Sequence, residues 1–517
     1  MDITPMFRTT NKPTIFIFAI TFIIIFWSLI TPAFEFPDEQ AHFGTTSFLL
    51  AENHVPVGKE LDMTQEMAST QELLGIYRNS QGQNNYTYHP EYHLKYSDSQ
   101  IGISEQEIIN LNTPDLRSAY IATEAARYPR LYYDYESIFV KLVNSSDIFT
   151  RLFLARLGGI IFTLFMAYLV YQTGLLIFTR PLYASTLTTM VMLQPMFSFI
   201  SAGVNSDNLH NLLFTIVIYT GIKIIKSGFL PTTLILALTA TILDIYSKPQ
   251  GVLAIPIILL AILIRIIKAK NWRWLINLFL VGGLIILTGW NQFSRYLGII
   301  SSTNSHGASL LEFVSFSINK LVSQNIVWYW GVFKWLGVVL PPIYWQLANR
   351  VVLISALGLI VYLVKVIKKR KILISPYAIC YLLLTTSIYT LAIYYFDWHH
   401  TKTVGFSLGI QARYFFPTII LHMSLLMTGI LSLAPSQKIR TFLARGLVAL
   451  FLWLQLGGIW TLITSYYDTN SLNSFITQVS QYKPWFAKGD WWYLYITLYI
   501  ISLYVIIHSV LTSSDSD

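Results

Sequence analysis

The sequence predicts an all-α membrane protein: a polytopic transmembrane helical bundle of about 12 spans with a large helical first external loop. Composition is the first reason, because 54% of the 517 residues are hydrophobic and only 12% are charged. A soluble chain of this size needs a more polar surface. The second reason is the recurrence of apolar runs of roughly 20 residues, the length that crosses a bilayer. The third is that basic residues concentrate in alternate links between these runs, whereas most acidic residues lie in the other links.

The apolar runs define the expected spans, and most links between them are short. Their approximate ranges are 14–32, 152–178, 182–200, 208–225, 230–246, 251–267, 274–290, 343–364, 372–395, 414–433, 447–463 and 491–511. Leu321–Trp345 is apolar enough for a thirteenth span. Because Pro341 and Pro342 break that run, we place it at the outer interface or in a re-entrant hairpin.

Domain boundaries follow from these spans and from the two long links between them. The expected units are a first transmembrane helix (1–33), an external loop subdomain with an acidic motif (34–150), a transmembrane core with external loop 291–342 (151–433), and C-terminal transmembrane helices (434–517). The first link is too long to be structureless, and stretches such as Glu105–Asn110 favour helix.

The distribution of charge predicts the orientation in the membrane. Short alternate links hold 17 of the 35 basic residues, including Lys365–Lys371, whereas 17 of the 26 acidic residues lie in 34–150. The positive-inside rule then predicts an even number of spans, cytoplasmic N- and C-termini and an external acidic loop. The net charge of +9 is thereby explained by topology and by attraction to anionic membrane lipids, so no nucleic-acid partner is expected. Cys380 is the only cysteine, which excludes an intramolecular disulfide.

The most informative motif is Pro37-Asp38-Glu39-Gln40-Ala41-His42, which follows the first span directly. No small-residue cleavage site follows the span, so we expect a retained helix rather than a signal peptide. Two adjacent carboxylates and an imidazole at a membrane surface can perform acid–base chemistry. The alternative is that Asp38 caps a helix that begins near Glu39.

Polar residues also recur at the outward ends of other expected helices. They are Asn205, Asp207, Asn208, His210, Asp244, Lys248, Asp397, His399, His400, Lys402, Gln411 and Arg413. Ionisable groups at membrane depth are costly unless they pair or line a wet cavity, so their position on one side predicts a shared aqueous site. Each alone could equally be a solvated helix end, and Asp244 and Lys248 could form an i, i+4 pair.

A series of motifs resembles a known family. The motifs are Pro-Asp-Glu-x-x-His at 37–42, Tyr128-Pro129-Arg130-Leu131-Tyr132-Tyr133, Asn205-x-Asp207, Trp330-Gly331-Val332-Phe333-Lys334-Trp335 with Pro341, and Gln411-Ala412-Arg413-Tyr414-Phe415-Phe416-Pro417. Residues 14–433 are thus similar to bacterial polytopic predicted membrane proteins long catalogued as a domain of unknown function, DUF2142. That family is grouped with the GT-C membrane glycosyltransferases, which take sugars from polyprenyl phosphates.

The resemblance implies an enzyme of GT-C type in the cell membrane. Its catalytic acidic residue would be Asp38, with Glu39 as the second choice. The carboxylate would act as the general base that takes the acceptor proton in an inverting transfer. Its donor would be a polyprenyl-phosphate sugar, and its acceptor an extracytoplasmic cell-wall glycan, lipid-linked saccharide or protein. The expected substrate-binding residues are His42, Arg130, Tyr132, Asn205, Asp207, Lys248, Trp330, Lys334, Gln411 and Arg413. Arg413 suits the phosphate because its guanidinium holds two oxygens at once, although it could instead snorkel at the interface.

Several alternatives stay open at this point. Asp38, Glu39, Asp207, Asp397 and His399 offer ligands for a divalent cation, but no local spacing matches a metal motif. A transporter or flippase of lipid-linked saccharide would also be polytopic, although such proteins usually place polar groups near the bilayer midplane. A noncatalytic envelope-assembly protein is the third class. The residues do not identify the sugar or the acceptor.

Overall fold

The computed structural model describes residues 4–79, 84–97, 101–121, 123–272, 275–288 and 310–513. Within these ranges helices make up nearly all of the regular structure, and the strands form two short two-stranded sheets. Nine helices of the described part are long and apolar enough to cross a membrane. The prediction of an all-α polytopic membrane bundle is therefore confirmed.

Those nine helices correspond to nine of the expected spans. They are α1 (Thr4–Ile30), α6 (Ile148–Phe178), α9 (Asp207–Ser227), η3 with α11 (Pro249–Leu253 and Ala254–Ala269), α16 (Pro342–Ile367), α17 (Pro376–Val404), η6 with α18 (Ala412–Thr418 and Ile419–Leu433), α19 (Gln437–Tyr466) and α21 (Trp491–Thr512).

The other three expected spans are helical but short or broken. α10 (Pro231–Ile245) and α12 (Leu275–Thr288) contain 15 and 14 residues. At about 1.5 Å per residue they fall short of a hydrocarbon core of roughly 30 Å. The expected span 182–200 divides into α7 (Pro181–Met192) and α8 (Pro195–Ser201). Pro195 cannot continue a helix, and the Gln194 side chain caps α8 by accepting a hydrogen bond from the Phe197 amide.

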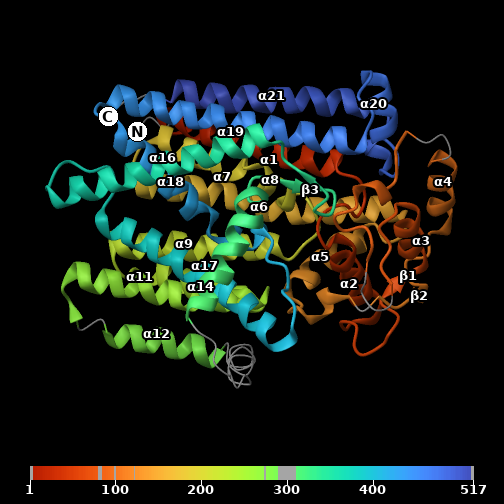
Figure 1. Cartoon of the computed structure of the whole chain (residues 1–517), viewed down its shortest axis with the longest axis horizontal. Coiled ribbons are helices and arrows are strands. Elements are labelled where there is room, and N and C mark those ends of the chain that lie inside the picture. Colours follow the sequence, from red (N-terminus) through yellow and green to blue (C-terminus); the bar gives the residue numbers. More distant parts are fainter. Residues whose placement is uncertain are drawn as a thin grey trace.

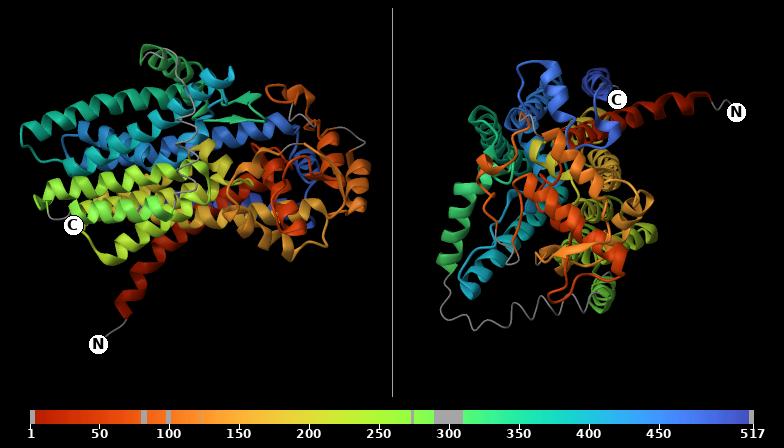
Figure 2. Two further views of the ribbon diagram at one scale, coloured as in Figure 1. Left: turned by 90° about the horizontal axis from the view of Figure 1, so that it is seen from below. Right: turned by 90° about the vertical axis from the view of Figure 1, so that its right-hand side faces the viewer.

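The long helices lie side by side along the long axis of the molecule, and the segments between α1 and α6 gather at one end (Figures 1 and 2). These segments are α2 (Glu39–Glu52), α3 (Gln65–Leu73), α4 (Ile101–Leu111), α5 (Leu131–Leu142) and the antiparallel pair β1 (Met63–Thr64) and β2 (Arg117–Ala119). The start of α1, the end of α21 and the α16–α17 turn lie at the opposite end (Figure 1). The start of α1 and the end of α21 therefore lie on the same side of the bundle.

Two glycines let helices α16 and α18 approach closely. A Cβ atom added to Gly358 would lie 2.0 Å from the Gly429 carbonyl oxygen, and one added to Gly429 would lie 2.1 Å from the Ser355 carbonyl oxygen. The backbones are thus in direct contact, as is common where small residues meet between membrane helices.

Leu321–Trp345 does not form a thirteenth span. α14 (Leu310–Lys320) continues through a π-turn (Leu321–Asn325) into α15 (Ile326–Trp328), and a hairpin of β3 (Val332–Phe333) and β4 (Val338–Val339) follows. The hairpin packs on the turn that follows α1, where the Trp335 indole donates to the Phe34 carbonyl over 3.3 Å. The earlier part of the expected external loop, 291–309, lies outside the described residues.

Candidate active site

Asp38 has an unusual backbone conformation at the start of α2. The helix begins at Glu39 as expected, and Asp38 occupies its N-cap position with φ 59° and ψ 14°, in the left-handed region. Its side chain makes no capping hydrogen bond. A left-handed conformation costs a non-glycine residue roughly 1–2 kcal/mol, so other contacts must hold it. The Asp38 carboxylate instead accepts a hydrogen bond from the Arg413 guanidinium.

Asp38 and Arg413 belong to a row of alternating charges that we call the charge cluster: Asp38, Arg413, Asp207 and Lys248. Arg413, in η6, also lies 3.9 Å from the Asp207 carboxylate at the start of α9. Lys248, just before η3, donates to the other Asp207 oxygen. The Asp38 side chain is 24% exposed, against 3% for Arg413 and 8% for Asp207. The cluster is thus buried except at Asp38, where it reaches solvent.

Aromatic rings surround the two cations of the charge cluster. The Arg413 guanidinium lies 5.3 Å from the centre of the Tyr414 ring, and the Lys248 ammonium lies 5.6 Å from the same ring and 5.9 Å from that of Tyr128. Cation–π contacts of this kind stabilise buried positive charge. They place both cations where an anionic ligand would meet little competition from water.

The surroundings determine the protonation states of Asp38 and His42, which follow α1. Burial raises the pKa of the Asp38 carboxyl, but the charge and hydrogen bond of Arg413 outweigh burial, and the pKa lies below its ordinary value. Burial lowers the pKa of His42 to about 4, in spite of the Asp38 charge. At neutral pH Asp38 is therefore ionised and His42 is neutral. The His42 Nδ1 atom lies 2.9 Å from the Tyr133 hydroxyl.

A shallow dent that has no room for a water molecule adjoins the charge cluster. Its walls come from α9, α17, η6 and the turn before α11, and the residues that line it are Asp207, His210, Lys248, Gln250, Tyr389, Tyr414 and Pro417. His210 is held there from both ring nitrogens: Nδ1 lies 2.6 Å from the Asp244 carboxylate and Nε2 lies 3.3 Å from the Tyr389 hydroxyl. Asp244 and Lys248 do not form the i, i+4 pair that their spacing allows. Asp244 instead pairs with His210, and Lys248 pairs with Asp207, both on α9.

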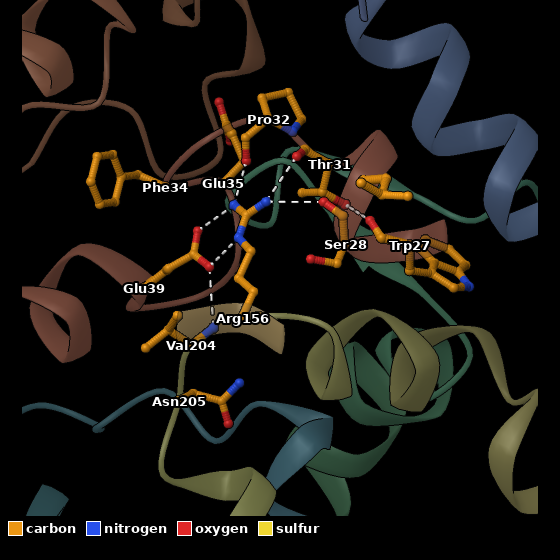
Figure 3. Close-up of polar contacts among 12 residues, drawn as sticks. Trp27, Ser28, Thr31, Pro32, Phe34, Glu35, Glu39, Arg156, Val204 and Asn205 are labelled. Carbon is orange, nitrogen blue, oxygen red and sulfur yellow. Dashed lines mark hydrogen bonds and ion pairs between the residues drawn. The ribbon is translucent and has the colours of Figure 1, made fainter. Parts of the chain in front are cut away.

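Glu39 lies next to Asp38 in the chain but faces the protein interior (Figure 3). Its two oxygens accept hydrogen bonds of 2.7 and 2.6 Å from Arg156 of α6, and one also accepts from the Val204 amide over 3.1 Å. The same guanidinium donates to the carbonyl oxygens of Ser28, Thr31 and Pro32. We call this arrangement the Arg156 clamp. It fixes the end of α1 and the start of α2, and so positions Asp38.

A protein-family model supplies the identification. The model described as "Predicted membrane protein (DUF2142)" matches residues 21–422, which is most of the chain and includes all four residues of the charge cluster. The chain belongs to this family. None of the curated proteins matches its sequence.

Among solved structures, this DUF2142 protein is similar to ArnT from Cupriavidus metallidurans. The apo structure has 12% sequence identity and a TM-score of 0.41, over 96% of this chain and 76% of ArnT. The structure bound to undecaprenyl phosphate has 11% identity and a TM-score of 0.39, over 96% of this chain and 77% of ArnT.

The DUF2142 fold brings some of the expected site residues to the charge cluster and places others elsewhere. His42 lies beside it, and Tyr132 packs edge-on against His42 with ring centres 6.4 Å apart. Gln411 precedes Arg413 by two residues, and its side-chain oxygen is buried with no hydrogen-bond partner among the described residues. Asn205 donates to the Ile200 carbonyl over 2.9 Å, which fixes the turn before Asp207.

Three expected substrate-binding residues have other partners in this structure. Arg130 is exposed and pairs with Asp134 at 2.8 Å. The Trp330 indole donates to Asn349 over 2.7 Å within the bundle. Lys334 donates to the Ser465 carbonyl over 3.0 Å, at the end of α19. None of these contacts involves a residue of the charge cluster.

Among the described residues, the expected metal ligands do not all lie together. Across the described residues, no group of three His, Cys, Asp or Glu side chains is arranged to hold a metal ion. Asp397 instead accepts hydrogen bonds from the Ser407 hydroxyl and the Leu408 amide, which close the loop after α17. A carboxylate used in this way has little capacity left for a cation.

Sequence reasoning missed two residues that the structure places near Asp38, namely Arg156 and Arg78. Arg156 carried a clear signal, because a lone arginine within an apolar run needs a partner. His210, Asp244 and Lys248 were noted, but not their pairing across helices. Arg78, from the segments between α1 and α6, is close enough for its charge to act on Asp38, and no local pattern distinguishes it from any loop arginine.

Proposed function

We propose that this protein is an integral membrane glycosyltransferase of GT-C type that transfers a sugar from a polyprenyl-phosphate-linked donor to an extracytoplasmic acceptor. The acceptor is a cell-wall glycan, a lipid-linked saccharide or a protein. The termini are cytoplasmic in this proposal, and the charge cluster faces the outside. The single observation that carries it is the convergence of Asp38, Asp207, Lys248 and Arg413 at the outer ends of helices distant in sequence.

The cluster contains the two kinds of group that such a transfer needs. Lys248 and Arg413 supply buried positive charge and donors for a phosphate, and Arg413 can hold two oxygens at once. Asp38 supplies an ionised carboxylate at the only point where the cluster, as described, reaches solvent. The acceptor hydroxyl would therefore approach from the Asp38 side and give its proton to that carboxylate.

In the proposed reaction the acceptor oxygen attacks the anomeric carbon on the face opposite the phosphate. The bond from that carbon to the phosphate oxygen breaks, and its electron pair leaves with the polyprenyl phosphate. The acceptor proton moves to Asp38. Because the phosphate is already a good leaving group, one carboxylate suffices, unlike in glycoside hydrolysis, and the configuration is inverted.

The test is transfer of labelled sugar from a panel of synthetic undecaprenyl-phosphate sugars to membrane acceptors, with the purified full chain in lipid nanodiscs. We expect Asp38→Asn to lower the transfer rate by roughly 10²–10⁴-fold, the usual contribution of a general base. Arg413→Ala should weaken donor binding, because the phosphate loses its two-point contact.

Matched controls come from the exposed pair on α5. Asp134→Asn and Arg130→Ala remove the same chemical groups from the surface, where the two side chains are 42% and 54% exposed, and should leave transfer unchanged. Full transfer by both Asp38→Asn and Arg413→Ala would overturn the site assignment. Movement of lipid-linked saccharide across the bilayer without any transfer would establish the transporter class instead.

A further inference from the structure

The end of α1 is capped by side chains from distant parts of the chain. The last four carbonyl oxygens of a helix have no partner within it, and the sequence offers no glycine for the usual capping turn in Ile30-Thr31-Pro32. The first of these oxygens, that of Trp27, accepts from the Thr31 amide and hydroxyl at 3.1 and 2.8 Å. The second, that of Ser28, accepts from Arg156 of α6. The remaining two need donors from elsewhere.

These two donors belong to the C-terminal part of the chain. Tyr467 directly follows α19, and its hydroxyl donates to the Ile30 carbonyl over 2.7 Å. Lys483 lies in the link between α19 and α21, and its Nζ atom donates to the carbonyls of Leu29 and Thr31, each over 2.6 Å. Both side chains are buried. All four terminal carbonyls of α1 are thereby satisfied, and two of them depend on residues that follow α19.

A series of direct contacts leads from Lys483 to Asp38. The Thr31 carbonyl that accepts from Lys483 also accepts from Arg156 over 3.1 Å. Arg156 in turn holds both carboxylate oxygens of Glu39, the neighbour of Asp38 in the chain (Figure 3). The end of α1 and the start of α2 therefore belong to one hydrogen-bonded network, which the C-terminal part of the chain completes.

We propose that Lys483 and Tyr467 are positioning residues for the proposed transfer: by capping α1, they hold Asp38 where its carboxylate meets Arg413. The inference rests on the proposed function and extends the site beyond residues 21–422, the range that the family model matches. Both residues act through the end of α1, whose displacement would carry Asp38 away from Arg413. A misplacement of about 1 Å can slow a reaction roughly 100-fold, so such caps matter for the rate.

The first experiment separates positioning from donor binding by steady-state kinetics, with the full chain in nanodiscs and the labelled donor. Tyr467→Phe removes one hydroxyl and keeps the ring, and Lys483→Met removes the amine and keeps a long side chain. We expect kcat to fall about tenfold in Tyr467→Phe and about 100-fold in Lys483→Met. KM for the donor should stay unchanged, because the cations proposed to meet the phosphate are not on the displaced turn. A raised KM with unchanged kcat would overturn the positioning role.

The pH profile is the readout that a merely structural role would not move. Burial raises the pKa of Asp38, but Arg413, with smaller contributions from His42 and Arg78, holds it below its ordinary value. Asp38 must be ionised to act as the base. If it moves away from Arg413, its pKa rises, and the acidic limb of kcat/KM should move to higher pH in both variants. An unchanged limb would overturn the positioning role, since loss of folded protein lowers the rate equally at every pH.

Two other residues of the C-terminal part provide matched controls. Lys488→Met removes an amine that pairs with Glu105 at 2.7 Å, and Tyr495→Phe removes a hydroxyl that donates to the Phe486 carbonyl over 2.5 Å. Neither contact involves α1. Both control variants should therefore keep the wild-type kcat and the wild-type acidic limb, and a change as large as that of Tyr467→Phe would overturn the assignment to the α1 caps.

Thermal unfolding tests the same connection without any transfer. Asp38→Asn is combined with Lys483→Met and, should that variant not fold, with Tyr467→Phe. If the caps hold Asp38 at Arg413, this contact is already weakened in their absence, so Asp38→Asn should lower the unfolding midpoint less there than in the wild type. Additive shifts would overturn the positioning role and leave the proposed function standing. Coupled shifts in a protein that transfers no sugar would overturn the proposed function, while the caps would still hold Asp38 in place.

Discussion

Asp38 and Glu39 are neighbours in the chain with opposite environments. Glu39 is fully enclosed and its oxygens are taken by the Arg156 clamp, whereas Asp38 is partly exposed and bound to Arg413. Asp38 has a left-handed backbone at the N-cap of α2, and Glu39 is the first residue of that helix. We therefore assign the proposed base to Asp38 and treat Glu39 as the residue that holds it in place.

Loss of the Arg156 clamp should destabilise the protein. We expect Glu39→Gln to cost about 3–5 kcal/mol, since it leaves a buried guanidinium without its counter-charge. Thermal unfolding in detergent provides the measurement. Breaking the exposed Arg130–Asp134 pair with Asp134→Asn should cost no more than about 1 kcal/mol. An equal change in both variants would mean that the clamp contributes nothing beyond an ordinary surface pair.

At the scale of elements, the bundle is held by close helix contacts in addition to apolar burial. α16 and α18 meet backbone to backbone at Gly358 and Gly429. α18 continues directly from η6, which bears Arg413, so the position of α18 against α16 also sets the position of the charge cluster. The glycines thus connect helix packing with the geometry of the proposed site.

Gly429→Ala should separate α16 from α18, because the new methyl group would meet the Ser355 carbonyl oxygen at 2.1 Å. Overpacking of this kind typically costs about 1–3 kcal/mol. Gly446→Ala, in α19, is the control with the opposite expected sign: no atom lies within 4 Å of its added Cβ. Alanine there should stabilise the helix by up to about 1 kcal/mol. Unfolding midpoints of the two variants should therefore move in opposite directions.

For the whole molecule, the segments between α1 and α6 are joined to the bundle by a buried polar contact. Glu35, after α1, accepts hydrogen bonds from His93 and from Tyr466 at the end of α19, each at 2.8 Å. Burial acts to lower the pKa of His93, but the charge and hydrogen bond of Glu35 prevail, and the pKa lies above its ordinary value. The protonated imidazole therefore belongs to the folded state.

This contact makes the attachment of residues 84–97 dependent on pH. A histidine whose pKa is raised by folding contributes stability that is present below its unfolded value of about 6.5 and is lost as pH rises through the folded value. Hydrogen exchange of this segment, corrected for its intrinsic rate, should therefore speed up at alkaline pH. His93→Gln should remove that dependence, and the exposed His54→Gln should not. Constant protection of the wild type from pH 6 to pH 9 would contradict the assignment.

The orientation in the membrane is tested by cysteine labelling. Cys380→Ser gives a background without cysteine. In that background Glu52→Cys, in the external subdomain, should react with an impermeant maleimide in intact cells. Lys369→Cys, in the α16–α17 turn at the opposite end, should react only after permeabilisation. The reverse pattern would place the charge cluster in the cytoplasm and exclude an extracytoplasmic acceptor.

The sequence by itself determined the class of fold and the family. Apolar length and the alternation of charge depend on the solvent on each side of the membrane, so they are readable without knowing any contact. For this reason all twelve expected segments are helical within the described residues, and both termini lie at one end. Pro195 also lies within the expected span 182–200, and it divides that span into α7 and α8 because proline cannot continue a helix.

Only the tertiary structure decided which polar residues meet. Asp244 is four residues from Lys248, yet it pairs with His210, while Lys248 pairs with Asp207. Arg130 carries the same charge as Arg413 but remains at the surface. Which charged side chains come into contact depends on how helices far apart in the chain are rotated and crossed, and the packing of the whole bundle sets that arrangement. Local sequence therefore predicted that a polar site exists at the outer ends of the helices, and tertiary packing selected its members.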